Sequence, residues 1–195
     1  MHNARRSDSY RNRIYPDLHA VFMSCKRIGR EYYLRNAEEL APWLLGKILC
    51  HRVDGTVIRA KITETECYLG ENDTACHASK GKTKRNAPMY FEGGHLYVYL
   101  CYGMHSLINI VSGEKNSPEA VLIRGVEGAS GPGKASKLMQ IDTAFTGIDL
   151  CDAENIWLED DGSVVKYTVS KRIGIDYAKE EDRNRLWRFI AKTNK

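Results

Sequence analysis

The chain has 195 residues, of which 43% are hydrophobic and 28% are charged, and it carries a formal net charge of +4. This length suits a single domain, and the composition excludes a disordered or collagen-like chain. No apolar stretch of about 18 residues exists and residues 1–13 are polar and basic, so we expect neither a membrane-spanning helix nor a secretory signal. Six cysteines without a C-x-x-C pair favour reduced, mostly buried thiols.

Positive charge is concentrated near the N-terminus. Residues 1–30 contain seven Lys or Arg and two acidic side chains, whereas the remaining 165 residues carry a net charge of −1. We therefore expect residues 1–30 to form a basic, flexible arm and residues 31–195 to form the folded domain. The arm is either a plain disordered tail or a segment that strengthens binding to a polyanion through its charge.

The first predicted element is a helix that Asn36 caps, with Glu39 as its capping-box partner. Pro42 is expected to interrupt or restart this helix, and Gly46 to end it. Turn residues and apolar runs then predict strands over residues 47–53, 56–68, 95–102, 106–111, 120–126, 156–158, 164–169 and 186–190. A long loop with a short helix is expected over 70–94, and a second short helix over 134–140. These elements predict a single mixed α+β domain, built on a curved, antiparallel-rich sheet with a protruding hairpin, short helices and long loops.

The long strand over 56–68 carries carboxylates where apolar residues are expected. Alternation places the apolar side chains at 58, 60 and 62 on one buried face, and continuing it places Glu64, Glu66 and Tyr68 on the same face. A buried carboxylate needs a partner or a raised pKa, and both suit acid–base chemistry. Alternatively, the strand bulges or frays after Ile62 and both glutamates are solvated.

Two further features lie nearby. Tyr102 precedes Gly103 at the expected tip of a hairpin, where a large aromatic ring is either a wedge for stacked bases or ordinary sheet packing. The basic run Lys80, Lys82, Lys84 and Arg85 is either a solvated surface or a set of phosphate contacts.

Other chemistries find little support in the sequence. Residues 128–135 (GASGPGKA) nearly match the phosphate loop of triphosphatases, but Ala135 lacks the hydroxyl that binds magnesium and no alternating βαβ pattern surrounds the loop. This turn opens a helix with Ser136 and Lys137, where a single phosphate fits. The Cys and His residues lack zinc-site spacing, and no G-x-S-x-G motif of a serine hydrolase occurs.

A set of short motifs falls in the order and near the spacing of a known family. The motif positions are 64–70 (ETECYLG), His77, 85–86 (RN), 97–99 (YVY), 102–104 (YGM), Asn109, 121–124 (VLIR), 131–133 (GPG) and 136–137 (SK). Through them the chain resembles the alkyladenine (3-methyladenine) DNA glycosylase family from about Tyr32 to Ile190. The resemblance implies a base-excision repair enzyme that flips an alkylated purine out of duplex DNA and hydrolyses its N-glycosidic bond.

The resemblance also implies a role for each matched position. Glu66 would activate the attacking water as general base, and Arg124 would help to hold that water. The base pocket would be lined by Tyr68, His77, Tyr99, Asn109 and Leu122. Tyr102, supported by Met104, would fill the gap left in the duplex. The DNA backbone would be contacted by Arg85, Ser136 and Lys137. Glu64 has no catalytic role in the family and is expected to be structural.

The implied enzyme is a monomer that acts on double-stranded DNA containing alkylated bases, without a metal, a cofactor, a lyase step or contact with a membrane. Its lesions would be of the 3-methyladenine, 7-methylguanine or ethenoadenine type. It would work in the cytoplasm with the nucleoid if bacterial, and in the nucleus if eukaryotic. The alternative is a non-catalytic module on the same scaffold that binds damaged DNA or RNA.

Two positions depart from the family pattern. Cys67 replaces the usual alanine beside the general base and is expected to narrow the pocket slightly. The segment 185–189 lacks the proline that often precedes Trp-Arg-Phe, which concerns the end of the fold more than the site.

Overall fold

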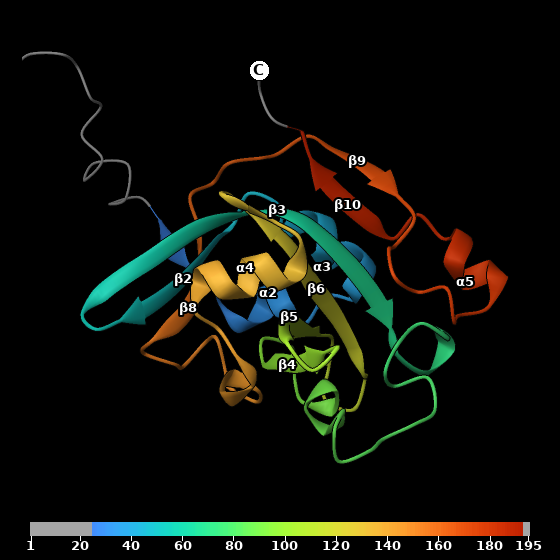
Figure 1. The fold of residues 1–195 in the computed structure, drawn as a ribbon. Coiled ribbons are helices and arrows are strands. Elements are labelled where there is room, and N and C mark those ends of the chain that lie inside the picture. Colours follow the sequence, from blue (N-terminus) through green and yellow to red (C-terminus); the bar gives the residue numbers. More distant parts are fainter. Residues whose placement is uncertain (1–24, 193–195) are drawn as a thin grey trace, which may run out of the picture.

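The computed structural model describes residues 25–192, which form one large antiparallel sheet with short helices around it (Figure 1). Along its main path the strand order is β1-β8-β2-β3-β6-β5-β4, while β10 pairs with β3 and β9, and β7 pairs with β6. Every strand pairing in this sheet is antiparallel. The predicted mixed α+β domain with an antiparallel sheet is confirmed.

The strands are β1 (Lys26–Arg27), β2 (Ile48–Val53), β3 (Thr56–Leu69), β4 (Leu96–Cys101), β5 (His105–Ser112), β6 (Glu119–Val126), β7 (Ala129–Ser130), β8 (Ile156–Asp160), β9 (Tyr167–Ser170) and β10 (Arg188–Ala191). The α-helices are α2 (Arg30–Tyr33), α3 (Ala37–Trp43), α4 (Pro132–Met139) and α5 (Glu180–Asn184). Three 3₁₀ helices complete the described elements: η1 (Gly70–Asn72), η2 (Ala87–Tyr90) and η3 (Thr143–Phe145).

Strand β3 is the long, curved strand that joins the two halves of the sheet in Figure 1. Its first half pairs with β2, and its second half lies between β6 and β10. The pairing with β6 shifts register around Glu64, which marks a bulge. Gly125 of β6 lies opposite this bulge, and a Cβ atom at that position would lie only 3.2 Å from Cβ of Glu64.

The bulge reverses the side-chain alternation of β3. Ile62 and Cys67 are five residues apart, which a regular strand would put on opposite faces, yet both lie in the main hydrophobic core. Thr65 also points to this side, where its hydroxyl donates to the carbonyl of Ala41 in α3. The predicted placement of Glu64, Glu66 and Tyr68 on the face of Ile62 is therefore wrong, because the extra residue turns them to the other face.

Two predicted helices are present with altered boundaries. Asn36 caps α3 as expected, since its side-chain oxygen accepts a hydrogen bond from the Glu39 amide at 2.9 Å. The expected interruption at Pro42 is wrong: Pro42 lies inside α3, and Leu44 still donates to the carbonyl of Leu40. Proline at this position removes only the hydrogen bond that an amide would donate to the carbonyl of Glu38. The second helix, α4, begins two residues earlier than expected and packs on β5 and β6.

Six of the predicted strands match β2 to β6 and β8 within a few residues, while two C-terminal strands are shifted. The strand expected over 164–169 begins only at Tyr167 as β9, and Val164 is 97% exposed. The strand expected over 186–190 is β10, which begins at Arg188. The short elements β1, β7, α2 and α5 carry no clear pattern in the sequence and were not predicted.

The boundary expected at residue 30 falls within ordered structure. Ile28 is buried in the main core, and the guanidinium of Arg27 donates to the carbonyls of Leu150 and Ala153. Residues 1–24 of the expected basic arm lie outside the described residues.

Three of the six cysteines, Cys50, Cys67 and Cys76, are buried, whereas Cys25, Cys101 and Cys151 are partly exposed. Within residues 25–192, no helix is both long and apolar enough to cross a membrane.

Strands β4 and β5 form the predicted hairpin, which Figure 1 shows at the lower front of the molecule. Its tip has positive φ angles at both Tyr102 (51°) and Gly103 (70°). The side chains on either side of Gly103 project from the protein, since Tyr102 is 88% exposed and Met104 is 72% exposed. A bulky residue with positive φ is strained, and such strain concentrates at functional sites.

The cap of α3 gives a test of the local fold. Replacing Asn36 with Ala removes the acceptor for the Glu39 amide, and we expect the free energy of unfolding to fall by about 1 kcal/mol. Urea denaturation measures this change. Asn36→Asp keeps an acceptor and should stay near the wild-type value, so an equal loss in both variants would contradict the capping role.

Candidate active site

A pocket of about 510 Å³ opens between the sheet, the 70–94 loop, the start of α4 and the segment 173–177. Its volume falls in the range of about 300–1,000 Å³ that is typical of small-molecule sites. The pocket brings together six of the positions predicted from the resemblance: Tyr68, His77, Tyr99, Asn109, Leu122 and Arg124. Tyr102 lies at the same pocket, so the hairpin tip and the cavity form one continuous feature.

Glu66 is a fully buried acid at this site, with 0% exposure. Its Oε1 atom accepts a hydrogen bond from the Ile173 amide at 3.0 Å, and its Oε2 atom accepts one from the Tyr68 hydroxyl at 2.9 Å. Arg124 Nε lies 3.6 Å from Oε1. Ile173, Tyr68 and Arg124 all line the pocket, so the carboxylate lies directly behind its wall.

Burial raises the pKa of Glu66 above its ordinary value. The charge of Arg124 and the hydrogen bonds from Ile173 and Tyr68 oppose this shift without cancelling it. A carboxylate with a raised pKa is a stronger base than a solvated one, because removal from water destabilises its charged form. The site thus holds a carboxylate that accepts a proton more readily than a solvated one does.

Arg124 of β6 is shared between two carboxylates. Its Nε atom lies 3.0 Å from Oε1 of Glu64, closer than its 3.6 Å to Glu66. Arg188 of β10 lies beyond Glu64, and its Nη1 atom donates to the same Oε1 atom at 3.1 Å. The four side chains form an alternating row of charge in the order Arg188, Glu64, Arg124, Glu66.

Aromatic rings form one wall of the pocket. The rings of His77 and Tyr99 meet edge to face with centroids 4.5 Å apart, and Tyr97 lies 5.5 Å from Tyr99. The Tyr97 hydroxyl and Nδ1 of His77 are hydrogen-bonded at 2.9 Å. Loss of hydration lowers the pKa of His77, and the nearby charge of Arg85 lowers it further. This wall offers flat π faces and a neutral imidazole at pH 7.

Asn109 and Leu122 face each other across β5 and β6. Asn109 is only 4% exposed, and its side-chain amide donates to the carbonyls of Tyr97 and Leu107 at 3.0 and 3.2 Å. Because two backbone acceptors hold it, this amide cannot turn away from a ligand without losing both bonds.

A buried ion pair supports the pocket from behind, and the sequence analysis missed it. The guanidinium of Arg172 donates to both carboxylate oxygens of Asp73, and both side chains are fully buried. The same guanidinium lies over the Tyr68 ring, with Cζ 4.7 Å from the ring centroid. Arg172 immediately precedes Ile173, so the pair fixes both groups that donate to Glu66. Asp73 and Arg172 are far apart in the chain, and no local signal connects them.

Cys67 does not narrow the pocket, contrary to expectation. After the bulge its side chain lies in the main core on the opposite face of β3 from Glu66, and it is absent from the pocket lining. The extra sulfur therefore affects core packing and leaves the space for a ligand unchanged.

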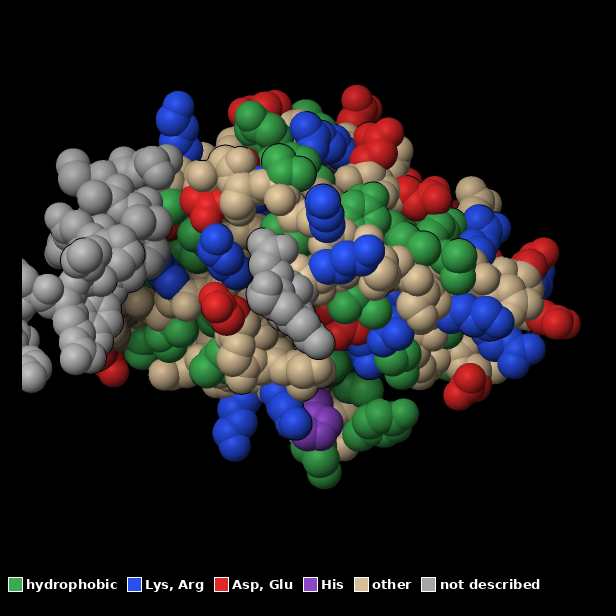
Figure 2. All heavy atoms as spheres, turned by 90° about the horizontal axis from the view of Figure 1, so that it is seen from above, with side chains coloured by type: hydrophobic (Ala, Val, Ile, Leu, Met, Phe, Trp, Pro, Cys, Tyr) green, Lys and Arg blue, Asp and Glu red, His purple; other side chains and the backbone are tan. Residues whose placement is uncertain are grey.

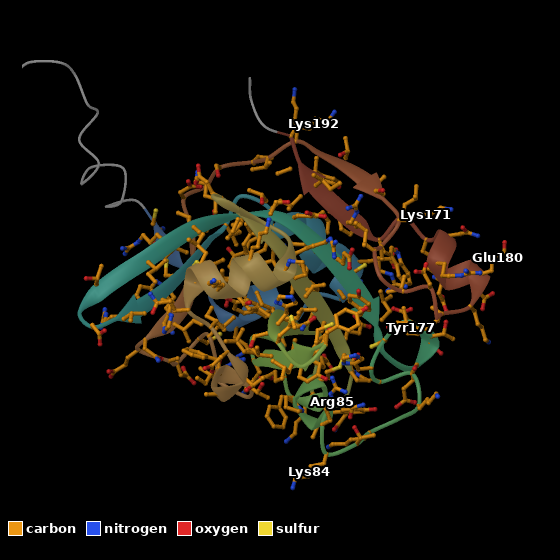
Figure 3. The ribbon with its side chains drawn as sticks, viewed as in Figure 1. Lys84, Arg85, Lys171, Tyr177, Glu180 and Lys192 are labelled. Atoms are coloured by element: carbon orange, nitrogen blue, oxygen red, sulfur yellow. The ribbon has the colours of Figure 1, made fainter. Side chains whose placement is uncertain are left out.

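The residues predicted to contact the DNA backbone differ in their availability. Arg85 is exposed beside the pocket, where its guanidinium lies over the Tyr99 ring and donates to the carbonyl of Leu100 at 3.5 Å. Figure 3 shows Lys84 and Arg85 together at one edge of the molecule. Lys137 of α4 is also exposed, whereas Ser136 is buried with its hydroxyl bonded to the carbonyl of Gly133. A side-chain contact with phosphate is thus open to Arg85 and Lys137 but not to Ser136 as it stands.

Tyr177 and the surface charge complete the surroundings of the site. Figure 3 shows Tyr177 beside the 70–94 loop, where its hydroxyl donates to the carbonyl of Ala75 at 2.8 Å. On the face shown in Figure 2, basic and acidic side chains are interspersed. No group of His, Cys, Asp and Glu within residues 25–192 is arranged to hold a metal ion.

Comparison with known proteins identifies the family. The sequence profile of methylpurine-DNA glycosylases (MPG) matches residues 31–129 and 127–195, which is most of the chain. The chain belongs to the methylpurine-DNA glycosylase family. These are DNA repair glycosylases that act on alkylated bases. The resemblance seen in the sequence is confirmed.

Several relatives, each provisionally named a 3-methyladenine DNA glycosylase, align along most of their length. The protein of Borreliella afzelii is 43% identical over 182 residues, which cover 86% of this chain and 97% of that protein. The protein of Methanocella arvoryzae is 42% identical over 187 residues, or 86% of this chain and 93% of that protein. The protein of Clostridium novyi is 41% identical over 198 residues, or 87% and 97%.

The state of His77 can be tested in solution. Because burial and the charge of Arg85 both disfavour the imidazolium, we expect the pKa of His77 to lie below 6.5. Replacing Arg85 with Gln removes one of these causes and should raise that pKa toward its ordinary value. NMR titration of the imidazole protons measures both. A His77 pKa above 6.5 in the unaltered protein would contradict this account.

Proposed function

We propose that this protein is a monofunctional DNA glycosylase. It flips alkylated purines of the 3-methyladenine, 7-methylguanine and ethenoadenine type out of duplex DNA, and it hydrolyses their N-glycosidic bond with a water that Glu66 activates. The observation that carries the proposal is the fully buried carboxylate of Glu66 behind an aromatic pocket of about 510 Å³. A non-catalytic binding module gains nothing from a buried charge of this kind, whose burial costs free energy.

The reaction follows from the placement of charge. A water at the pocket wall gives its proton to Glu66 as its oxygen attacks the sugar carbon, and Arg124 orients that water and balances the negative charge. The leaving purine takes the electrons of the broken C–N bond. An N3- or N7-alkylated purine is cationic, so it leaves as a neutral base and needs no strong general acid. Ethenoadenine is neutral, so it must take up a proton from solvent as it leaves.

The same geometry argues against a lyase step. A lysine that forms a Schiff base is activated when it is desolvated. Lys134 lines the pocket at the start of α4, but its side chain is exposed. We therefore propose that water is the only nucleophile and that no cofactor takes part.

Selectivity for alkylated bases has two sources in the pocket. The rings of Tyr68, His77 and Tyr99 provide stacking worth roughly 1–3 kcal/mol per base, and they attract a cationic purine more strongly than a neutral one. Asn109, held by two carbonyls, would crowd the exocyclic amine of a normal guanine.

Contact with duplex DNA would come from the hairpin tip and its neighbours. We assign Tyr102 as the side chain that fills the gap left by the flipped base, supported by Met104. Arg85 and Lys137 would bind phosphate, and the basic residues before residue 25 would add charge attraction. We propose that the protein acts as a monomer, and its bacterial relatives support action in the cytoplasm at the nucleoid.

Replacing Glu66 with Gln tests the mechanism. The amide cannot accept a proton from water, so we expect single-turnover release of 7-methylguanine to fall by about 10²–10⁴-fold while duplex binding is retained. In the unaltered enzyme the rate should rise with pH through an acid limb above 4.5, because the raised pKa of Glu66 delays its ionisation. Excision by the Gln variant at the wild-type rate would refute the role.

Replacing Tyr102 with Ser tests the wedge. Loss of a ring that stacks in the duplex should reduce the flipped population, and with it the excision rate, by roughly tenfold, in line with about 1–3 kcal/mol per stacked ring. Fluorescence of ethenoadenine in duplex DNA reports flipping directly. Tyr102→Phe keeps the ring and should behave like the wild type, so similar losses in both variants would argue against insertion.

A further inference from the structure

The charged row behind the pocket contains two side chains for which the proposed mechanism has no task, Glu64 and Arg188. Glu64 lies at the bulge of β3, and its side chain is only 14% exposed. Arg188 lies in β10 directly across from Glu66, and its side chain is 18% exposed. Glu64 pairs with two arginines, and one of them is the arginine of the site.

We propose that Glu64 is a positioning residue that holds Arg124 away from Glu66, and that Arg188 holds Glu64 in that position. This inference rests on the proposed function, because it concerns how well Glu66 serves as the base. Nε of Arg124 is 0.6 Å closer to Glu64 than to Glu66. The Nε–H group also makes no hydrogen bond of good geometry with either carboxylate, so Arg124 acts on both by its charge.

The position of the Arg124 charge between Glu64 and Glu66 has a chemical consequence. A carboxylate in close contact with an arginine is stabilised in its ionised form and becomes a weak base. A carboxylate without any cation, buried as Glu66 is, would be protonated to a much higher pH. Because Arg124 lies closer to Glu64, its charge lowers the pKa of Glu66 less than a close contact would, and Glu66 remains the stronger base.

Other groups around Glu66 belong to the same balance. Tyr68 on β3 and the Ile173 amide donate hydrogen bonds to its carboxylate, and Arg172 lies behind the Tyr68 ring. The charge of Arg172 is already paired with Asp73. These groups stay in place when Glu64 or Arg188 is replaced, so the row itself can be tested.

The two positions predict shifts of opposite sign. In Glu64→Gln, Arg124 is released toward Glu66 and a neighbouring negative charge is removed, and both changes lower the pKa of Glu66. In Arg188→Gln, a nearby positive charge is lost and Glu64 holds Arg124 alone, and both changes raise it. A neighbouring charge at such distances moves a pKa by about one unit or more.

The experiment is the pH dependence of single-turnover excision from a duplex containing 7-methylguanine, whose departure needs no protonation. We expect the acid limb to move down by about one pH unit in Glu64→Gln, with roughly tenfold slower excision above the limb because the base is weaker. In Arg188→Gln the limb should move up by about as much, and Arg188→Lys should restore it. Glu154→Gln, at an exposed glutamate before β8, is the matched control and should leave the limb unchanged.

The outcomes distinguish a failure of the proposed function from a failure of the positioning role of Glu64. If the wild-type protein releases no base, or Glu66→Gln is fully active, the proposed function fails. If the wild type depends on Glu66 but both variants keep the wild-type limb, or shift it in the same direction, the positioning role is refuted. Urea denaturation shows which variants are folded, and if Glu64→Gln does not fold, the upward shift in Arg188→Gln and its reversal in Arg188→Lys decide the question.

Discussion

Burial of the Glu66 carboxylate is the constraint on which this structure depends. An isolated charge in such a place would cost many kcal/mol, so the fold must supply partners from several directions. It does so with the Tyr68 hydroxyl, the amide of Ile173 and the charge of Arg124. Each partner comes from a different part of the chain, and the same three residues form the pocket wall. The stability of the fold and the chemistry of the site thus depend on the same contacts.

The bulge in β3 makes this arrangement possible. Without the extra residue, a strand that buries Ile62 in the core would also turn Glu66 toward the core. With it, Thr65 and Cys67 face α3 and the core, while Glu66 and Tyr68 face the pocket. Bulges frequently redirect a side chain next to active sites. Here a single bulge lets the first half of β3 pack in the core while Glu66 and Tyr68 of its second half face the pocket.

Much of the fold was predictable from local signals. The cap at Asn36, the turn residues and the alternation of apolar residues fix α3 and most strands, because these signals act over a few residues. The order of the short motifs also predicted which residues line the pocket, from Tyr68 to Arg124. The features that the sequence did not predict depend on contacts between distant parts of the chain. The bulge changes the face of Glu66 only because β6 pairs on both sides of it, and the Arg172–Asp73 pair joins segments 99 positions apart. The Ser136 hydroxyl is a local exception, because it donates to the carbonyl of Gly133 only three residues earlier.

The free thiols have a consequence for a protein of this family. Reagents that methylate purines also react with cysteine, and they react with the thiolate form. Burial raises the pKa of Cys76, at the pocket itself, to about 11, and that of Cys50 to about 12. Both sulfurs therefore remain protonated and unreactive at neutral pH. Agents that methylate purines would therefore leave these two buried thiols unmodified.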